Sequence, residues 1–509
     1  MKPRISIQWP TLDLLWPWVV WAAFGFYIAL VPLPPNDFWW HLKVGELIYQ
    51  TGHIPTTNMF AWSLPAETPF FYGAWLGEWL LYLLYHLGGL ALVMVARNGI
   101  VLGAYAIVAA EARRRGGSWR MVALPLALAC FMSMNNLILR PQMWSWMPLA
   151  LYLWLLGRYV DGKLHSAWLL LCPAMMVFWV NAHGAFILGL VLLGAFTVGE
   201  GLRTGLKQTG ARSWREVGWL AGVSGLTAAS TFVNPRGTGI MDYVIGLMTN
   251  PPSQTLIVEW QSPTPTGGAN TVFYISILIL LLVLAYSRYR LTPTEALLVV
   301  GFLWLAWNGQ RYVVWFGMVV MPVLAHALKE LPVKRPAFVP RRNAFNLLLM
   351  VLLVLPLVLA QPWFVEQLPL PETYWAQVWR NIPAGPLLST ATPVGATAYL
   401  KAHPGGRLFN EMGYGSYLIW AAPEQPVFID PRVELYPYEQ WLDYKHIGQG
   451  VRSLELLEKY GVNRVLLDNE LQEELRNVLE HAENWHCEYA DEHAQMWIEV
   501  TRVVEKGIS

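Results

Sequence analysis

Long apolar stretches separated by short polar loops recur through the first 360 positions of the chain. Each stretch runs for roughly 16–22 residues, which is about the length of helix that crosses the hydrocarbon core of a bilayer. The stretches cover residues 14–33, 89–110, 119–137, 142–157, 166–180, 184–201, 217–233, 271–287, 293–308, 312–328 and 344–361. The pattern therefore predicts an all-α polytopic membrane domain over residues 1–361, with about eleven transmembrane helices.

Two amphipathic segments lie between the first and second predicted spans. Residues 37–50 follow a Pro-Pro-Asn sequence and carry apolar positions at helical spacing. Residues 74–88 are apolar but short, and the pair Gly88-Gly89 ends them. We expect both to form helices at the outer surface of the membrane.

The pattern changes after Gln361. A proline-rich stretch over residues 362–393 is interpreted as a linker. Beyond it, short apolar runs at 407–410, 427–430, 464–468, 485–490 and 495–502 predict buried strands. Helical patterns at 437–448, 453–460 and 469–481 lie between them. Residues 394–509 are therefore expected to form a small α/β domain.

The composition supports a membrane protein. Hydrophobic residues make up 55% of the chain and charged residues only 14%, where a soluble domain carries roughly 25% charged residues. The 28 tryptophans suit membrane–water interfaces. A net charge of +1 provides no positive electrostatic field that would attract nucleic acid. The three scattered cysteines provide neither a disulfide framework nor a metal site.

Lysine and arginine are distributed unevenly between alternate loops, and this asymmetry predicts the orientation. With a cytoplasmic N-terminus, the inner loops hold Lys2, Arg4, Arg113, Arg114, Arg115, Arg120, Arg158, Lys163, Arg203, Lys207, Arg212, Arg215, Arg288, Arg290, Lys329, Lys334, Arg335, Arg341 and Arg342. The outer loops hold only Lys43, Arg140, Arg236 and Arg311. We therefore expect a multi-pass protein of the plasma (inner) membrane with an extracytoplasmic C-terminal domain.

The few polar residues at the outer ends of the spans are candidates for a binding site, because ionisable groups at a membrane edge are costly. Arg140, Arg236 and Arg311 each occupy an unusual turn there, and His183 and Glu259 are on the same predicted side. Arginine binds phosphate through two parallel hydrogen bonds. The group predicts a site for a lipid phosphate, with anchoring to phospholipid headgroups as the alternative for any single arginine.

Two carboxylates on this side are candidates for catalysis. Asp37 lies at the start of the first amphipathic helix, with His41 one turn later and Lys43 beyond it. A carboxylate at the water–lipid boundary suits a general base, although Asp37 at this place also complements the helix dipole. Glu78 lies in an aromatic stripe that suits a sugar ring, and a glutamate pointing to water is the alternative.

The chain resembles the GT-C superfamily of integral-membrane glycosyltransferases, which use polyprenyl-phosphate sugars. The resemblance rests on the acidic residue after the first span and the helix that follows it, in residues 36–48 (NDFWWHLKVGELI). Residues 140–142 (RPQ), 413–420 (GYGSYLIW) and 427–432 (VFIDPR) resemble features of a poorly characterised bacterial branch.

The resemblance implies that Asp37 activates an acceptor hydroxyl for an inverting transfer of sugar from a polyprenyl-phosphate donor. The acceptor would be a lipid, a glycan or a protein at the outer face. Many members carry two adjacent acidic residues in the first loop, and here the first is Asn36. The first loop therefore lacks the paired acidic motif that would support a divalent metal, and no cofactor is assigned.

Two other classes of function stay open. A flippase or transporter of lipid-linked intermediates would carry polar residues through the bilayer depth, where this chain has mainly Arg97 and, near an inner edge, Glu200. A non-catalytic membrane assembly protein would use the C-terminal region to bind partners.

Overall fold

The computed structural model describes residues 10–333, 343–380, 382 and 385–500. The inner-loop residues Lys2, Arg4, Lys334, Arg335, Arg341 and Arg342, and the end of the run 495–502, lie outside these residues. The chain divides into two compact units. Unit 1 comprises Met1–Val31, Ala91–Gly246 and Gln254–Pro369, and unit 2 comprises Pro32–Leu90, Leu247–Ser253 and Leu370–Ser509.

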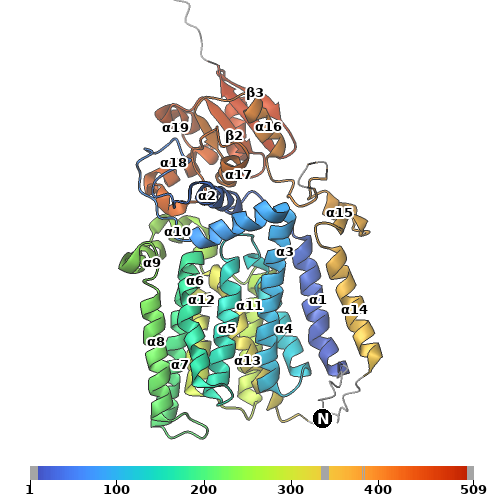
Figure 1. Ribbon diagram of the computed structural model, residues 1–509. Helices are drawn as coiled ribbons and strands as arrows, with labels where there is room; N and C mark the ends of the chain where they lie inside the picture. The colour runs from blue at the N-terminus through green and yellow to red at the C-terminus, as the bar shows by residue number, and fades with distance from the viewer. Residues whose placement is uncertain (1–9, 334–342, 381, 383–384, 501–509) are drawn as a thin grey trace, which may run out of the picture. The chain divides into compact units, whose positions relative to one another are not determined.

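Unit 1 is a bundle of long helices (Figure 1). Its helices are α1 (Leu15–Leu30), the second part of α3 (Trp75–Gly116), α4 (Arg120–Met132), α5 (Met143–Val160), α6 (Leu171–Ala182), α7 (Ile187–Gly205), α8 (Trp214–Ser230), α11 (Gly268–Tyr286), α12 (Pro293–Asn308), α13 (Val313–Lys329) and α14 (Ala344–Leu359). Short helices α9 (Ile240–Met248) and α10 (Pro251–Leu256) follow α8. Short 3-10 turns link several helix ends, among them η2 (Met134–Asn136), η4 (Gly184–Phe186), η6 (Val258–Trp260) and η7 (Gln310–Tyr312).

A helix covers every stretch that the sequence predicts to span the membrane. Among the described residues, five segments are long and apolar enough by length and composition to cross a bilayer, namely Leu12–Leu30, Trp75–Gly116, Gly184–Gly205, Gly268–Tyr286 and Gln310–Lys329. The number of spans, about eleven, stays a prediction.

Small residues allow the helices of unit 1 to approach closely. A Cβ atom on Gly199 of α7 would lie 2.4 Å from the Cα of Thr294 on α12. A Cβ on Gly317 of α13 would lie 3.2 Å from the Cα of Ala129 on α4. Close backbone contact at glycine is a common way for helices to associate in membranes, where apolar burial gives little preference between lipid and protein.

Unit 2 contains a four-stranded sheet of order β1-β2-β4-β3. The strands are β1 (Leu408–Asn410), β2 (Arg464–Asp468), β3 (Trp485–Ala490) and β4 (Ala494–Glu499). β1 pairs parallel to β2, with Phe409 opposite Val465, and β4 pairs antiparallel to both β2 and β3. The helices of this part are α15 (Glu372–Trp375), α16 (Val394–Ala402), α17 (Met412–Ala421), α18 (Tyr438–Gly448), α19 (Ser453–Tyr460) and α20 (Glu473–Glu480).

The predicted mixture of short strands and helices in the C-terminal region is thus confirmed, with one correction. Residues 427–430 form no regular strand in the described chain, although Val427 makes an isolated bridge to Ala61. The side chain of Asn410 takes the place of a neighbouring strand: its Oδ1 accepts from the Phe428 N–H (2.8 Å) and its Nδ2 donates to the Ile429 carbonyl (2.8 Å).

The segment after α1 is built into unit 2. It contains α2 (Phe38–Thr51), a loop, and the first part of α3, which ends at the non-helical residues Gly88 and Gly89. The hydroxyl of Ser416 on α17 donates to the Asn36 carbonyl (2.6 Å) and accepts from the Trp40 N–H (3.1 Å). Trp62 and Val427 are joined by a backbone hydrogen bond of 3.0 Å. The first loop and the C-terminal region therefore fold together.

Candidate functional site

In unit 1, Arg140 forms a bidentate pair with Glu259. Its Nη2 lies 2.7 Å from Glu259 Oε2 and its Nη1 lies 3.2 Å from Oε1. Arg140 is only 7% exposed, and its Nε donates to Gln142 Oε1 at 2.9 Å. The Nε and both Nη atoms of this guanidinium therefore have fixed partners. The two Nη atoms are directed at the two oxygens of a carboxylate, and arginine binds phosphate with the same bidentate geometry.

Arg311 approaches the same carboxylate from another turn. Its Nη1 lies 3.7 Å from Glu259 Oε1, and its guanidinium lies 4.1 Å from the centre of the Trp260 ring. Two hydrogen bonds hold the turns η6 and η7 together: the Gln310 N–H donates to the Gln261 carbonyl (3.0 Å) and Gln310 Nε2 to the Val258 carbonyl (3.2 Å). These turns bring Glu259 to Arg311.

His183 is hydrogen-bonded to the N-terminal end of α5, close in sequence to Arg140. Its Nδ1 lies 2.9 Å from the hydroxyl of Ser145, in the first turn of α5, and accepts from the Ala185 N–H at 3.2 Å. The Ser145 hydroxyl in turn accepts from Trp179 Nε1 (2.8 Å). Burial, together with the positive charges of Arg311 and Arg140, lowers the pKa of His183 to about 3. The imidazole is therefore neutral at physiological pH.

The charge balance of this cluster depends on Glu259. Burial alone would raise the pKa of Glu259, but the guanidiniums of Arg140 and Arg311 lower it to about 2. One carboxylate thus faces two arginines and a neutral histidine. We call Arg140, His183, Glu259 and Arg311 the arginine cluster; it retains an excess of one positive charge.

Arg236 lies in the turn after α8, and Asn181, two residues before His183, donates to the Val233 carbonyl of that turn at 2.8 Å. It is exposed, and its guanidinium lies over the ring of Tyr243, 5.9 Å from the ring centre. Its backbone N–H donates to Asn234 Oδ1 at 2.7 Å, which closes the turn before η5 (Gly237–Gly239).

In unit 2, Asp37 occupies the N-cap position of α2 without capping it. Its side chain makes no capping hydrogen bond in the described structure, and the Phe38 N–H donates instead to Asn36 Oδ1 at 3.2 Å. Asp37 is partly exposed. The helix start is therefore stabilised by Asn36, so the Asp37 carboxylate is not required as the cap of α2.

His41, one turn after Asp37, is bonded to Glu78. His41 Nδ1 lies 2.7 Å from Glu78 Oε1, and Glu78 is fully buried. The two helices meet at Gly45, where a Cβ would lie 2.1 Å from the Glu78 carbonyl oxygen. Lys43 pairs with Glu46 on the same helix, with Nζ 2.6 Å from Oε2.

Unsatisfied polar atoms gather around this pair. Asn36 Nδ2, Trp40 Nε1 and Glu78 Oε2 are buried and find no hydrogen-bond partner among the described residues. Buried polar atoms are nearly always paired in native proteins, so these three atoms are exceptions to the usual pattern.

A charged pair, Asp430 and Arg432, is buried in unit 2 beside residues of the first loop. Arg432 is 1% exposed and donates to both oxygens of Asp430, from Nε at 2.8 Å and from Nη2 at 2.6 Å. Its Nη1 donates to the hydroxyl of Tyr72 at 3.1 Å. The motif VFIDPR was visible in the sequence, whereas its partner Tyr72 carried no local signal.

The two charges noted in or near the spans have structural partners. Arg97 donates to the carbonyls of Leu137 (2.6 Å) and Ile28 (3.0 Å) and to Asn98 Oδ1 (2.9 Å). Glu200 pairs with Arg203 at 2.8 Å. Arg97 thus ties α3 to two other segments, whereas Glu200 pairs with an arginine of its own helix α7 and also accepts from the Thr294 hydroxyl of α12 at 2.8 Å.

Within the described part of the chain, no three or more His, Cys, Asp or Glu side chains gather as a metal site would require.

Comparison with known proteins identifies the fold. No protein-family model matches the sequence, and no curated protein matches it. The arabinofuranosyltransferase AftD from Mycobacteria is 14% identical, with a TM-score of 0.53 over 97% of this chain and 40% of that chain. ArnT from Cupriavidus metallidurans, solved bound to undecaprenyl phosphate, is 14% identical, with a TM-score of 0.50 over 96% of this chain and 98% of that one. The fold is a GT-C fold.

This confirms the fold that the resemblance implied. AftD and ArnT are glycosyltransferases of the GT-C superfamily. At this level of identity the likeness concerns the fold, and the reaction of the present chain is argued from its own residues below.

The neutral His183 predicts a pH effect on stability. Because its folded pKa is about 3 and an unfolded histidine titrates near 6.5, the unfolded state binds the extra proton as the pH falls below about 6.5. Stability is then lost toward acid pH, by at most about 1.4 kcal/mol per pH unit. His183→Asn removes this titration and should flatten the fall in melting temperature between pH 7 and pH 5. Equal pH dependence of the two proteins would contradict a buried neutral His183.

Proposed function

We propose that this protein is a membrane glycosyltransferase that moves a sugar from a polyprenyl-phosphate donor to an acceptor at the outer face of the membrane. The observation that carries the proposal is the arginine cluster, in which Arg140 and Arg311 converge on one carboxylate. The shared fold with ArnT, solved with undecaprenyl phosphate, supports a lipid-phosphate donor.

In this proposal the two arginines receive the phosphate of the donor. A carboxylate and a phosphate present similar pairs of oxygens to a guanidinium. Glu259 holds Arg140 and Arg311 in place, and the phosphate takes over part of their hydrogen bonds when the donor binds. The leaving group is then a lipid phosphate whose developing negative charge the two guanidiniums stabilise. Arg236 and Lys43 contribute positive charge for attracting the anionic donor.

Asp37 is the proposed base. Its carboxylate takes the proton of the acceptor hydroxyl as the hydroxyl oxygen attacks the anomeric carbon. The bond from that carbon to the phosphate oxygen breaks, and its electron pair leaves with the lipid phosphate. Attack opposite to the leaving group inverts the anomeric centre. The partial exposure of Asp37 at the start of α2 supports this role, because an acceptor hydroxyl can approach the carboxylate from solvent.

Glu78 is assigned a positioning role rather than direct contact with substrate. A carboxylate that is 0% exposed cannot reach a sugar without moving its surroundings. Through the 2.7 Å contact with His41, Glu78 fixes the first two turns of α2, where Asp37 lies. This revises the direct catalytic role that the aromatic stripe suggested.

The phosphate role of the arginine cluster is tested with Arg311→Gln. The variant should bind undecaprenyl phosphate about tenfold more weakly, because a charge-assisted hydrogen bond contributes roughly 1.5–3 kcal/mol. The measurement is lipid binding by the purified full chain, followed by tryptophan fluorescence, together with sugar transfer from polyprenyl-phosphate donors.

A matched control is present in the chain. Arg380 lies 4.3 Å from the Trp375 ring centre and 3.6 Å from Glu372. Arg311 has the same kind of neighbours, a tryptophan ring and a glutamate. Arg380 differs in that it is exposed and belongs to unit 2. Arg380→Gln should bind the lipid as the wild type does. Unchanged binding by Arg311→Gln would remove the cluster from the mechanism, and no transfer by the wild type would overturn the proposed function.

A further inference from the structure

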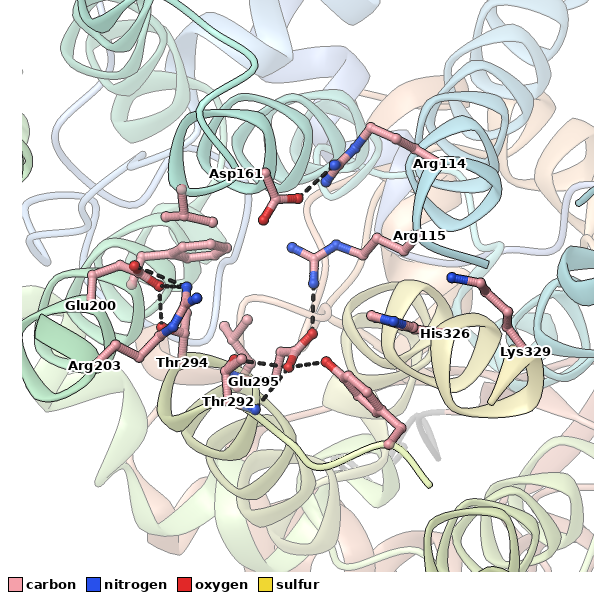
Figure 2. A pocket seen from close by; sticks show the side chains of 14 residues that line it. Arg114, Arg115, Asp161, Glu200, Arg203, Thr292, Thr294, Glu295, His326 and Lys329 are labelled. Carbon is pink, nitrogen blue, oxygen red and sulfur yellow. Dashed lines mark hydrogen bonds and ion pairs between the residues drawn. The ribbon is translucent and has the colours of Figure 1, made fainter. Parts of the chain in front are cut away.

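A polar cavity of about 340 Å³ lies within unit 1 at the helix ends opposite to the arginine cluster (Figure 2). α5 begins beside Arg140 and ends beside Asp161, which lines the cavity. An α-helix of this length extends for about 27 Å. The charged and polar residues that line the cavity are Arg114, Arg115, Asp161, Glu200, Arg203, Tyr289, Thr292, Thr294, Glu295, His326 and Lys329.

The acidic residues of the cavity are already satisfied by neighbours. Glu200 is fully buried and accepts from Arg203 and Thr294, each at 2.8 Å. Glu295 is 3% exposed and accepts from Arg115 (2.7 Å) and from the hydroxyls of Thr292 and Tyr289. These carboxylates have little capacity left for a ligand.

The nitrogen groups of the cavity are not all satisfied. Arg203 Nε and His326 Nδ1 are buried and have no hydrogen-bond partner in the described part of the chain. Lys329 has three N–H donors, and its ion pair to Glu330 at 3.2 Å is half exposed. The unused capacity of the cavity is therefore largely that of donors, which match a ligand rich in acceptor oxygens.

The nitrogen groups of the cavity are also arranged asymmetrically. Arg115, His326 and Lys329, from α3 and α13, lie on one side of the cavity, across from Glu200 and Arg203 on α7 (Figure 2). Arg114 lies near this cationic side and pairs with Asp161 through its Nη1 (2.5 Å). An anion placed here would meet positive groups from two helices at once.

We propose that this cavity binds a phosphate group, carried either by a phospholipid headgroup or by a small soluble phosphate ester. The cavity of about 340 Å³ is far larger than a single water molecule needs. This is enough for a phosphate with a glycerol-sized substituent. The site is separate from the arginine cluster, and the charge distribution of the loops predicts that it faces the cytoplasm.

The proposal is tested with His326→Gln combined with Lys329→Gln in the purified full chain. Both substitutions preserve side-chain polarity and leave the buried pairs of Glu200 and Glu295 intact. Glycerol 3-phosphate binding is measured by calorimetry after delipidation, and retained phosphatidylglycerol is measured by native mass spectrometry. Lys207→Gln, at an exposed inner-loop lysine that does not line the cavity, is the matched control.

Wild type should bind one of the two probes saturably, the double variant at least about tenfold more weakly, and Lys207→Gln like wild type. Asp161→Asn should tighten binding several-fold, because it removes a carboxylate that competes for Arg114; loss of folding cannot produce this gain. Binding of only the lipid identifies a headgroup site, and binding of only the soluble ester identifies a metabolite site. No saturable binding in either arm, or a double variant equal to wild type, overturns the proposal.

Discussion

Asp37→Asn should lower the rate of sugar transfer by about 10²- to 10⁴-fold, the usual contribution of a positioned general base. Asparagine has nearly the shape of aspartate but cannot take the proton of an acceptor hydroxyl. The loss should appear in kcat, while undecaprenyl phosphate binds as it does to the wild type. Because Asn36 rather than Asp37 provides the capping oxygen to α2, the variant should keep this helix cap.

The measurement is transfer from a panel of radiolabelled polyprenyl-phosphate sugars to membrane acceptors. Glu46→Gln is the matched control, since it removes a carboxylate from the same helix by the same type of change. Glu46 pairs with Lys43 at the surface of α2, and the mechanism gives it no role. Equal transfer by Asp37→Asn and wild type would rule out Asp37 as the base. Equal losses in both variants would indicate a general effect of charge on α2.

Arg432→Met should produce the largest loss of stability, about 3–5 kcal/mol in unit 2, because it leaves the Asp430 carboxylate buried without its partner. Burial would lower the pKa of Arg432, but Asp430 beside it raises that pKa, so the guanidinium stays charged in the folded protein. The guanidinium also lies 5.0 Å from the ring centre of Phe60 and 5.4 Å from that of Phe70. Its removal should loosen the first loop and lower sugar transfer as well.

Adding Asp430→Asn to Arg432→Met should recover part of the loss, because the charge that lacks a partner is then absent. Arg452→Gln is the surface control: Arg452 pairs with Glu455 in an exposed ion pair, and its substitution should cause no measurable change. Stability is measured as the denaturant dependence of proteolysis at sites in residues 385–500 of the full chain. A double variant that is less stable than Arg432→Met would contradict the role of the uncompensated carboxylate.

These predictions separate two kinds of residue that look alike in the sequence. Asp37 and Asp430 each lie close to the end of an apolar run and next to a proline-containing sequence. Only Asp430 becomes fully buried in an ion pair, whereas Asp37 stays partly exposed. Substitution of Asp430 is therefore expected to affect stability, and substitution of Asp37 is expected to affect catalysis.

The sequence by itself determined the features that depend on neighbouring residues. Apolar runs of fixed length predicted a helix at each of eleven stretches, and the short runs at 407–410 and 464–468 became β1 and β2. The helix predicted over residues 37–50 is α2 (Phe38–Thr51), and Asn36 of the preceding Pro-Pro-Asn sequence accepts from the Phe38 N–H. Such signals are local, since backbone hydrogen bonds in a helix and side-chain caps join residues only a few positions apart.

Only the tertiary structure decided which distant segments meet. Residues 427–430 looked like a strand, but their hydrogen bonds go to Asn410 and to the first loop, so no sheet forms there. His41 and Glu78, and likewise Arg140 and Glu259, lie far apart in the sequence, and their pairing depends on how helices and turns approach one another. The cavity between α3, α7, α12 and α13 is also a product of packing, because its inner-loop arginines are indistinguishable in the sequence from residues that merely set the orientation.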